Sequence, residues 1–414
     1  MTTQPSRGEF VTMLFNRRDA EGSVFRLDEN NLAVFDAELA RKINTANYAD
    51  LDLGDRLIDV VRGRASRPVL WSSVRSTWST VLRELATAEH HAALDERMTA
   101  VIDQRLDEHL NLAWLAQEVI TRALVPVVID GLTPRGSAAV HADMIWKIGH
   151  LMQTAELHRK REPVRTVRGM LIGQLRAGMA VRAEISGRAR RTRPNHDDLT
   201  DPMAGELLDQ LGRDRAVDAV TTVLTAIAGP PGAAATSLFY ELVNHPRWVA
   251  RIAAELSEVD DKAFTAAPVG AAPLTARFVK EVLRMWSPPL FLSRVVRTEI
   301  PVPDGVLRPG QQYLLSPYMI HHDPRKWPDP DTFDPDRWLP GNCNRRASGA
   351  PYLPFGFAPI SCIGAGLGMV LLMLLCRLFC TRYRIEPDRP IPPMVLAAVP
   401  MPRDFTGRVV RTNR

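Results

Sequence analysis

The sequence predicts a mainly α-helical protein with a smaller β region. Three observations support this fold class. Helical periodicity of the apolar residues dominates positions 80–242. Short β-like segments, joined by proline and glycine turns, follow Pro288. An apolar run from Ile363 predicts one further helix, and a β-like tail ends the chain. Because no clean linker separates these parts, we expect residues 1–414 to form a single domain.

The first half of the chain starts with strands and continues with helices. Residues 23–27 and 32–35 alternate between apolar and polar, which is typical of two short strands joined by a turn. Asp36 is the expected N-cap of a helix over residues 37–44. The pattern over Val217–Asn244 predicts a long central helix.

The second half contains two irregular segments. Residues 263–273 are rich in Ala, Pro and Gly, which predicts a loop. Residues 324–354 hold seven prolines and little periodicity. Long segments of this kind in compact proteins are often functional, and the Trp and Phe residues within it predict that it packs against the body.

The composition excludes several classes of protein. Of the 414 residues 45% are apolar and four are cysteines, so the chain is neither disordered nor a disulfide scaffold. Residues 1–16 contain no long apolar run, and we therefore expect neither a signal peptide nor a membrane anchor. The longest apolar stretch, residues 368–380, is interrupted by Arg377 and is too short to cross a bilayer. The expected location is the reducing cytoplasm.

The positive net charge of +5 does not indicate a nucleic-acid partner. No C-x-x-C pair, recognition-helix pattern or alternation of aromatic and basic residues accompanies it. The densest basic run comprises Arg188, Arg190, Arg191 and Arg193, and we interpret it as a solvated loop.

The most informative segment runs from Pro354 to Gly364 and contains Cys362 just before an apolar helix. Free N–H groups at a helix N-terminus stabilise a thiolate. A thiolate in an apolar pocket is a good axial ligand for haem iron, and it favours O–O cleavage. Phe355 would shield the sulfur, and Gly364 would let the backbone approach a flat macrocycle. The alternative is an ordinary buried cysteine.

Two further motifs precede this segment. Glu281 and Arg284 form an E-x-x-R pair on one helix face, and residues 322–338 contain D-P-x-x-W-P-D-P-x-x-F-x-P-D-R-W. In this order, and followed by F-G-x-x-x-x-x-C-x-G, the motifs closely resemble the cytochrome P450 family of haem-thiolate oxygenases. The resemblance implies the P450 fold, with haem b between the long central helix and the Cys-loop helix.

The resemblance also implies roles for individual residues. Cys362 would be the axial iron ligand, with Phe355 and Gly364 beside the haem. Arg294 would bind one haem propionate. Arg83 would bind the second, although a plain surface arginine is an equal alternative. A buried ion network would hold together the proximal side, which is the side of the axial cysteine, and its members would be Glu281, Arg284 and Arg337.

The chain departs from the family pattern at two places. Ala358 stands where the family usually has Gly, and Ile360 replaces an Arg or His that would bind a propionate. In the central helix the family has an acid and an alcohol that relay protons. Aligned on Ala228-Gly229, this chain has Pro231 and Gly232 at those positions, and aligned on His245-Pro246 it has Gly229 and Pro230. Under either alignment both groups are missing. Two prolines must kink or open the helix. Either water or the substrate then delivers the protons, or the haem serves another purpose.

The expected substrate pocket is mostly apolar. We assign to it Trp71 and Trp78 from a loop before Thr80, where they would stack on an aromatic substrate. The other expected members are Ala226, Gly229, Ala233, Leu290, Phe291 and Leu292.

These observations favour a soluble, monomeric, bacterial-type P450 that activates O2. Its electrons would come from ferredoxin and ferredoxin reductase, because no flavin or iron–sulfur domain fits in the chain. The missing acid–alcohol pair favours an atypical oxidation, such as aromatic oxidative coupling in secondary-metabolite biosynthesis, with a cyclic dipeptide as a candidate substrate. One alternative is an ordinary monooxygenase that hydroxylates a small hydrophobic compound. Another is a haem-binding protein without turnover.

Overall fold

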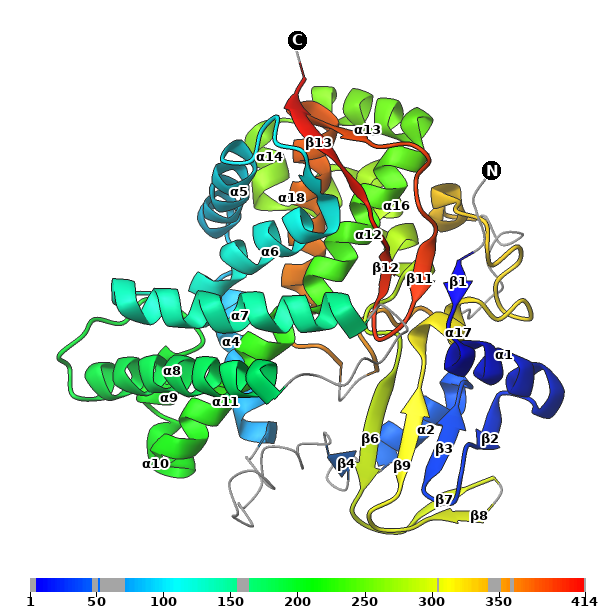
Figure 1. Ribbon diagram of the computed structural model, residues 1–414. Coiled ribbons are helices and arrows are strands. Elements are labelled where there is room, and N and C mark those ends of the chain that lie inside the picture. Colours follow the sequence, from blue (N-terminus) through cyan, green and yellow to red (C-terminus); the bar gives the residue numbers. More distant parts are fainter. Residues whose placement is uncertain are drawn as a thin grey trace.

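The computed structural model describes residues 5–46, 51–52, 71–154, 164–303, 305–341, 351–357 and 361–412. Helices form most of the molecule, and the largest sheet packs at one side of them (Figure 1). The predicted fold class, mainly α with a smaller β region, is therefore confirmed.

The first half of the chain is helical after a short β hairpin. Polar caps start two of its central helices: Thr87 accepts from His90 N–H, and Asn111 accepts from the N–H groups of Ala113 and Trp114. The described helices are α1 (Glu9–Glu21), α2 (Ala37–Ala46), α4 (Trp71–Glu84), α5 (Ala88–Asp103), α6 (Leu112–Val128), α7 (Pro134–Thr154), α8 (Val164–Ala189), α9 (Asp201–Ala204) and α10 (Leu208–Leu211).

The second half carries the helices that surround the centre of the molecule. The predicted central helix is two helices, because prolines occupy the first turn of the second one. The elements are α11 (Arg213–Ile227), α12 (Pro230–Asn244), α13 (Pro246–Glu258), α14 (Asp261–Ala266), α15 (Pro268–Ala271), α16 (Pro273–Met285), α17 (Pro317–His321), the 3-10 helix η2 (Pro335–Trp338) and α18 (Ala365–Thr381). The loop predicted over residues 263–273 is thus partly helical, since Asp260 caps α14 and prolines start the next two helices.

The largest sheet positions part of the site. Its strand order is β2 (Val24–Arg26), β3 (Asn31–Val34), β9 (Gln312–Leu315), β6 (Leu292–Val296) and β4 (Leu51–Asp52), and only the β3–β9 pair is parallel. Arg294 on β6 lies directly opposite Tyr313 on β9. Because facing residues of neighbouring strands share one side of a sheet, these two side chains lie together.

Three smaller sheets complete the β region. The first joins β1 (Ser6–Arg7), β11 (Met394–Leu396) and β12 (Pro400–Pro402). The second joins β10 (Tyr383–Pro387), β13 (Thr406–Arg411) and β5 (Leu110–Asn111). The third is the hairpin of β7 (Ile300–Val302) and β8 (Gly305–Leu307).

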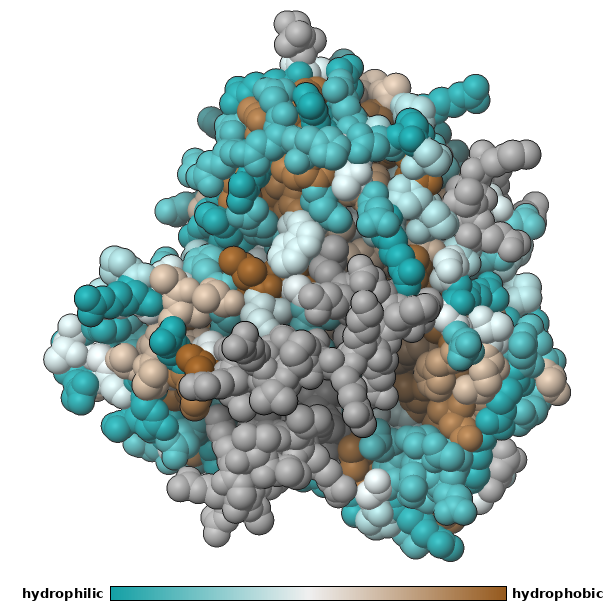
Figure 2. Space-filling view, viewed as in Figure 1, coloured by the Kyte–Doolittle hydropathy of each residue, from teal (hydrophilic) through white to brown (hydrophobic). Residues whose placement is uncertain are grey.

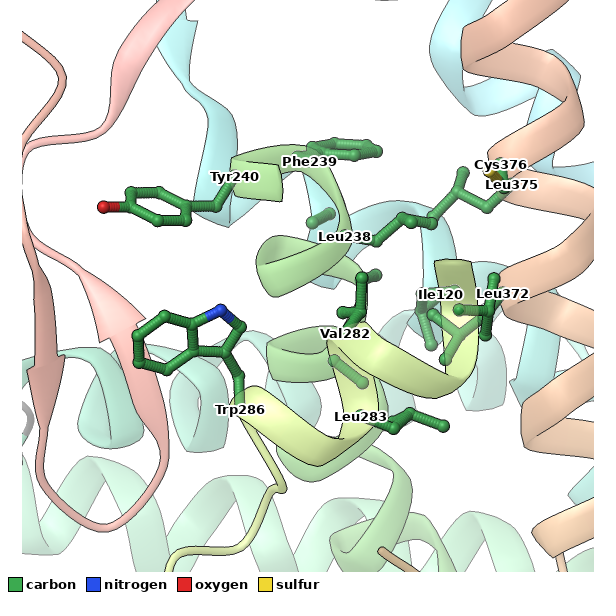
Figure 3. Packing of buried hydrophobic residues seen from close by; sticks show 14 of the residues in the cluster. Ile120, Leu238, Phe239, Tyr240, Val282, Leu283, Trp286, Leu372, Leu375 and Cys376 are labelled. Carbon is green, nitrogen blue, oxygen red and sulfur yellow. The ribbon is translucent and has the colours of Figure 1, made fainter. Parts of the chain in front are cut away.

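The main core lies between α6, α12, α16 and α18. Figure 3 shows Leu238, Val282 and Leu372 from three of these helices gathered in one apolar interior, and each is at most 4% exposed. A buried aliphatic side chain of this size contributes roughly 1.5–3 kcal/mol. The last described helix, α18, is apolar because it crosses this core, and no helix of the described chain is long and apolar enough to span a membrane.

The surface is otherwise mixed. In the view of Figure 2 hydrophilic side chains cover most of the described surface, and an apolar area lies over α7 and α8. Ile145, Leu175 and Met179 of these two helices are exposed.

The interpretation of the basic run as a solvated loop is wrong for Arg188. Its side chain is fully buried and pairs with Glu184 at 3.1 Å and with Asp198 and Asp201 at 2.6 Å each. Arg190 remains exposed. The acidic partners lie both before and after the arginine in the chain, and only the folded structure brings them together.

Candidate active site

A cavity of about 440 Å³ lies between the α11–α12 break, the start of α18 and the strands β6 and β9 of the five-stranded sheet. Cys362 faces it from the side of α18, and Ala226, Pro230 and Pro231 face it from the side of the break. The cavity therefore brings together the two regions that the sequence singled out.

Backbone hydrogen bonds position Cys362. Its N–H donates to Phe355 O at 2.7 Å, and Ala365 N–H, in the first turn of α18, donates to Cys362 O at 3.3 Å. Gly356 reaches a φ of 77°, which lets the chain turn between Phe355 and the cysteine. The sulfur is thereby held at the helix N-terminus, as the sequence predicts.

Cys362 is exposed to the cavity. Desolvation by the surrounding protein raises the pKa of its thiol, and the Gly364 N–H and the positive charge of Arg75 offset only part of this rise. A bound metal cation would favour the thiolate. The α18 side offers a flat surface: a Cβ at Gly368 would come within 3.3 Å of the Phe355 ring, which packs on this glycine. A Cβ at Gly364 would make only an ordinary contact with Cys362 Sγ, at 3.8 Å.

One end of the cavity is positively charged. Arg294 and Arg75 both line it, and Arg75 Nη2 donates to Ser361 O at 2.5 Å. Desolvation lowers the pKa of Arg294, whose Nη1 donates to Ser293 O at 2.8 Å, and among the described residues no carboxylate pairs with it. Tyr313 donates to Asn44 Oδ1 beside them, and burial raises its pKa to about 12, so it stays neutral.

These features fit haem b. A ligand that brings carboxylates to this end would compensate the charge of the half-buried Arg294, and Arg75 offers a second guanidinium beside it. The thiol on one face, the open backbone at Gly364 and the apolar residues of the wall suit a flat, largely apolar macrocycle.

Arg83 lies outside this arrangement. It is exposed, and its guanidinium donates to Ser79 O at 3.2 Å and to Thr80 Oγ1 at 2.9 Å. The surface-arginine alternative therefore describes it better. Sequence reasoning missed Arg75 because it started the helix at Thr80, whereas α4 starts at Trp71. An arginine four residues after a tryptophan, on one face of a helix, is the signal that was available.

The two tryptophans assigned to the pocket sit on a helix, not in a loop. Trp78 is 1% exposed and donates through Nε1 to Leu199 O at 2.7 Å, so it packs away from the cavity. A buried Trp with a satisfied N–H belongs to the core. The side chain of Trp71 lies outside the described part of the chain.

Of the remaining pocket residues, the cavity wall includes Ala226 and Leu292 but not the other four. Ala233 packs with Ala113, Val399 and Met401 behind α12. Leu290 is fully buried in the main core. Phe291 instead meets Phe10 edge to face at 5.7 Å. The backbone direction at Ala233, Leu290 and Phe291 turns their side chains away from the cavity, which the sequence pattern alone does not show.

The break between α11 and α12 changes how Pro230, Pro231 and Gly232 are interpreted. Ala228 and Gly229 separate the helices, and Pro230 and Pro231 fill the first turn of α12. Neither proline carries a proton donor, as the sequence predicts. Gly232 and Gly229 do not line the cavity, and Gly232 faces Gln117 of α6 instead.

A buried ion network lies on the other side of the cysteine loop. Glu281 is in contact with Arg284 at 2.8 Å and with Arg337 at 3.3 Å, and all three side chains are at most 2% exposed. Trp338 Nε1 and Asp334 N–H also donate to the Glu281 carboxylate, each at 3.0 Å. Both oxygens of the Glu281 carboxylate thus accept hydrogen bonds, as a buried carboxylate requires.

His321 connects this network to the cysteine loop. Leu353 N–H donates to its Nε2 at 2.9 Å, so the proton is on Nδ1, which is 2.9 Å from Ser287 Oγ. Burial, together with the charge of Arg284, lowers the pKa of His321 to about 3. No motif pointed to this histidine.

The buried histidine should make the fold sensitive to acid. Because its pKa is lower in the folded than in the unfolded chain, the unfolded chain binds more protons between pH 6.5 and 3. We expect the free energy of unfolding to fall by about 1.4 kcal/mol per pH unit across this window on account of His321. Urea unfolding at pH 7 and pH 5 measures it. The His321→Asn variant should show a shallower dependence, and an identical slope would contradict the assignment.

The comparisons with known proteins agree with this site. The family model "Cytochrome P450" matches residues 182–403, slightly more than half of the chain. Cyclooctatin synthase of Streptomyces melanosporofaciens is 34% identical over 207 residues, which is 49% of this chain and 44% of that protein. Cytochrome P450 4A10 of Mus musculus is 34% identical over 163 residues, 39% of this chain and 31% of the relative. The chain thus spans less than half the length of these curated relatives.

The solved structures extend the likeness to the whole fold. The retinoic acid-bound cyanobacterial CYP120A1 superposes with a TM-score of 0.77 at 15% identity, over 100% of both chains. A zebrafish cytochrome P450 with abiraterone gives 0.75 at 16% identity, over 97% of this chain and 99% of that one. From the family match, the fold and the thiol-bearing cavity together, we conclude that the chain belongs to the cytochrome P450 family, whose cofactor is haem b with an axial cysteine thiolate.

Proposed function

We propose that this protein is a haem-thiolate monooxygenase that oxidises a small, apolar, aliphatic substrate. The observation that carries the proposal is the cavity itself. It has a single thiol on one side, a pair of arginines at one end and aliphatic residues opposite the thiol.

In this proposal each contact with the haem has a named residue. Cys362 Sγ would hold the haem iron, Arg294 and Arg75 would bind the two propionates, and Phe355 would shield the sulfur. The haem, when bound, supplies the chemistry that places one atom of O2 in the substrate and releases the other as water, with two electrons and two protons taken up. The protein excludes water from the reacting space and orients the substrate.

The described wall supports an aliphatic substrate. Opposite the cysteine it presents aliphatic side chains and prolines, and its aromatic and polar members sit at the arginine end or beside the cysteine loop. The aliphatic members are Leu82, Ile120, Leu124, Val127, Val128, Leu199, Val223, Ala226, Ile227, Pro230, Pro231 and Ala234. Such a surface selects by shape and apolar area, since it offers few side-chain hydrogen bonds.

Aromatic oxidative coupling, including that of a cyclic dipeptide in secondary metabolism, is the second candidate. Its support is the loss of the acid–alcohol pair at Pro230 and Pro231. Trp78 gives it no support, because this side chain is buried elsewhere. We therefore rank hydroxylation of a small hydrophobic compound first.

Substrate titrations of the holoenzyme test the ranking. We expect a saturated polycyclic hydrocarbon to shift the haem spin state at lower concentration than the cyclic dipeptide of two tyrosines. Turnover under isotopically labelled O2 should place the label in the product. Tighter binding of the dipeptide and an unlabelled, coupled product would favour the second candidate. A normal ferrous–carbon monoxide spectrum without substrate-dependent NADPH consumption would favour a haem-binding protein without turnover.

The two propionate arginines give a further prediction. Arg294→Leu and Arg75→Leu should each release haem ~10-fold faster, because each removes a charge-assisted hydrogen-bond donor. Transfer of haem to an excess of apomyoglobin measures the rate. Arg83→Leu is the matched control and should behave as the wild type. Equal haem loss from the Arg83 variant would contradict the assignment of Arg75.

The electron supply is also part of the proposal. An acidic ferredoxin, reduced by its reductase, suits a chain with net charge +5 through electrostatic steering. A monomeric state and a cytoplasmic location stay predictions from the sequence.

A further inference from the structure

The polar side chain at the helix break comes from α6, not from the central helices. Gln117 is fully buried, and its Nε2 donates to Gly229 O at 3.2 Å. Gly229 O also accepts from Ala233 N–H at 3.0 Å. Gln117 thus binds the residue that directly precedes the first proline of α12.

Gly232 provides the space for this contact. A Cβ at Gly232 would overlap Oε1 and Cδ of Gln117 and come within 2.9 Å of its Cα. Since the obstacle includes backbone of α6, no side-chain rotation would relieve it. The missing side chain of Gly232 therefore leaves the space that Gln117 occupies, and we call this space the Gly232 slot. This contact, and not backbone flexibility, explains why a glycine stands in the first turn of α12.

Two oxygens behind the break have no donor. Gln117 Oε1 and Thr121 Oγ1 are buried and, within the described part of the chain, neither has a hydrogen-bond partner. The two residues lie four apart on α6, so they share one helix face. A buried oxygen without a partner is costly, and an ordered water that bridges two such groups is the usual solution.

We propose that Gln117 is a positioning residue of the cavity: it holds the α11–α12 break through the Gly232 slot and, with Thr121, binds a buried water that supplies protons through the break. In this inference the water has the role in proton supply that the acid–alcohol pair has in other members of the family. The proton-supply part of this inference rests on the proposed function, whereas the water site does not.

Crystallography and thermal unfolding test the water site without turnover. A crystal structure of the holoenzyme should show a water within hydrogen-bond distance of Gln117 Oε1 and Thr121 Oγ1. Thr121→Val should lower the melting temperature, because it removes a hydrogen bond to that water. If the hydroxyl has no partner at all, the methyl group should raise the melting temperature instead. That rise, or a crystal structure without the water, would overturn the proposal.

Turnover tests the proton supply. In Gln117→Met and Thr121→Val holoenzyme, we expect the product rate to fall ~10-fold, with the electrons diverted to hydrogen peroxide. In Thr121→Val, which leaves the contact of Gln117 with the break intact, the substrate affinity from the spin-state titration should stay unchanged, which a merely structural defect would not give. Gln210→Met, at an exposed position of α10, is the matched control. A wild-type ratio of product to peroxide in both variants would overturn the proton-supply role, and a wild type without any turnover would instead count against the proposed function.

Discussion

Cys362→Ala is expected to fold as the wild type does and to lose the thiolate-type shift of the ferrous–carbon monoxide spectrum together with all monooxygenation. The variant should fold because Cys362 is held through its backbone: its N–H and C=O bond to Phe355 and Ala365. The function should vanish because no other described sulfur faces the cavity. Optical spectra of the reduced protein with carbon monoxide measure the change, and thermal unfolding of the apoprotein checks the fold.

Cys380→Ala is the matched control for this experiment. Cys380 lies on α18, is half-buried and does not line the cavity. Its replacement should leave the spectrum as it is in the wild type. A thiolate-type spectrum that survives in Cys362→Ala would refute the ligand assignment.

Glu281→Gln should have the largest effect on stability. The substitution keeps the size of the side chain but leaves Arg284 and Arg337 buried without their shared carboxylate. Breaking a buried pair of this kind costs ~3–5 kcal/mol, because the desolvated charge left behind is uncompensated. We expect the free energy of unfolding to fall by this amount, and urea titration measures it.

An exposed ion pair provides the comparison. Glu386 pairs with Arg384 on β10, and its side chain is 47% exposed. Glu386→Gln should therefore cost less than about 1 kcal/mol. Equal losses in the two variants would show that burial of the network is not what makes it stabilising.

The sequence was sufficient where spacing along the chain determines contact. Glu281 and Arg284 are three residues apart on a helix, so their pairing is local, and the position of Cys362 before an apolar helix is also local. The fold class followed from the periodicity of the apolar residues, which indicates the buried face of each helix separately. Arg294 lies on β6, the strand after the E-x-x-R helix, and lines the cavity, while its contact with a propionate stays a prediction of the resemblance.

The sequence was insufficient where packing between distant segments determines the direction and the burial of a side chain. Trp78 and Arg75 lie on the same helix. Trp78 points into the core and Arg75 points to the cavity, and these directions can be predicted only if the start of the helix at Trp71 is known. Arg188 can be buried because the chain reverses direction after it and brings Asp198 and Asp201 into contact with its guanidinium. Gly232 looked like a substituted catalytic position, and only the approach of Gln117 from α6 explains it.

The proline pair at the start of α12 has a spectroscopic consequence. Pro230 and Pro231 have no amide proton, so the turn that faces the cavity is silent in amide-detected NMR and in hydrogen exchange. The amides of Gly229 and Gly232 border this silent stretch on either side. Selective isotope labelling of glycine would therefore place two resonances next to the reacting space, where they would report the arrival of a ligand without any change to the sequence.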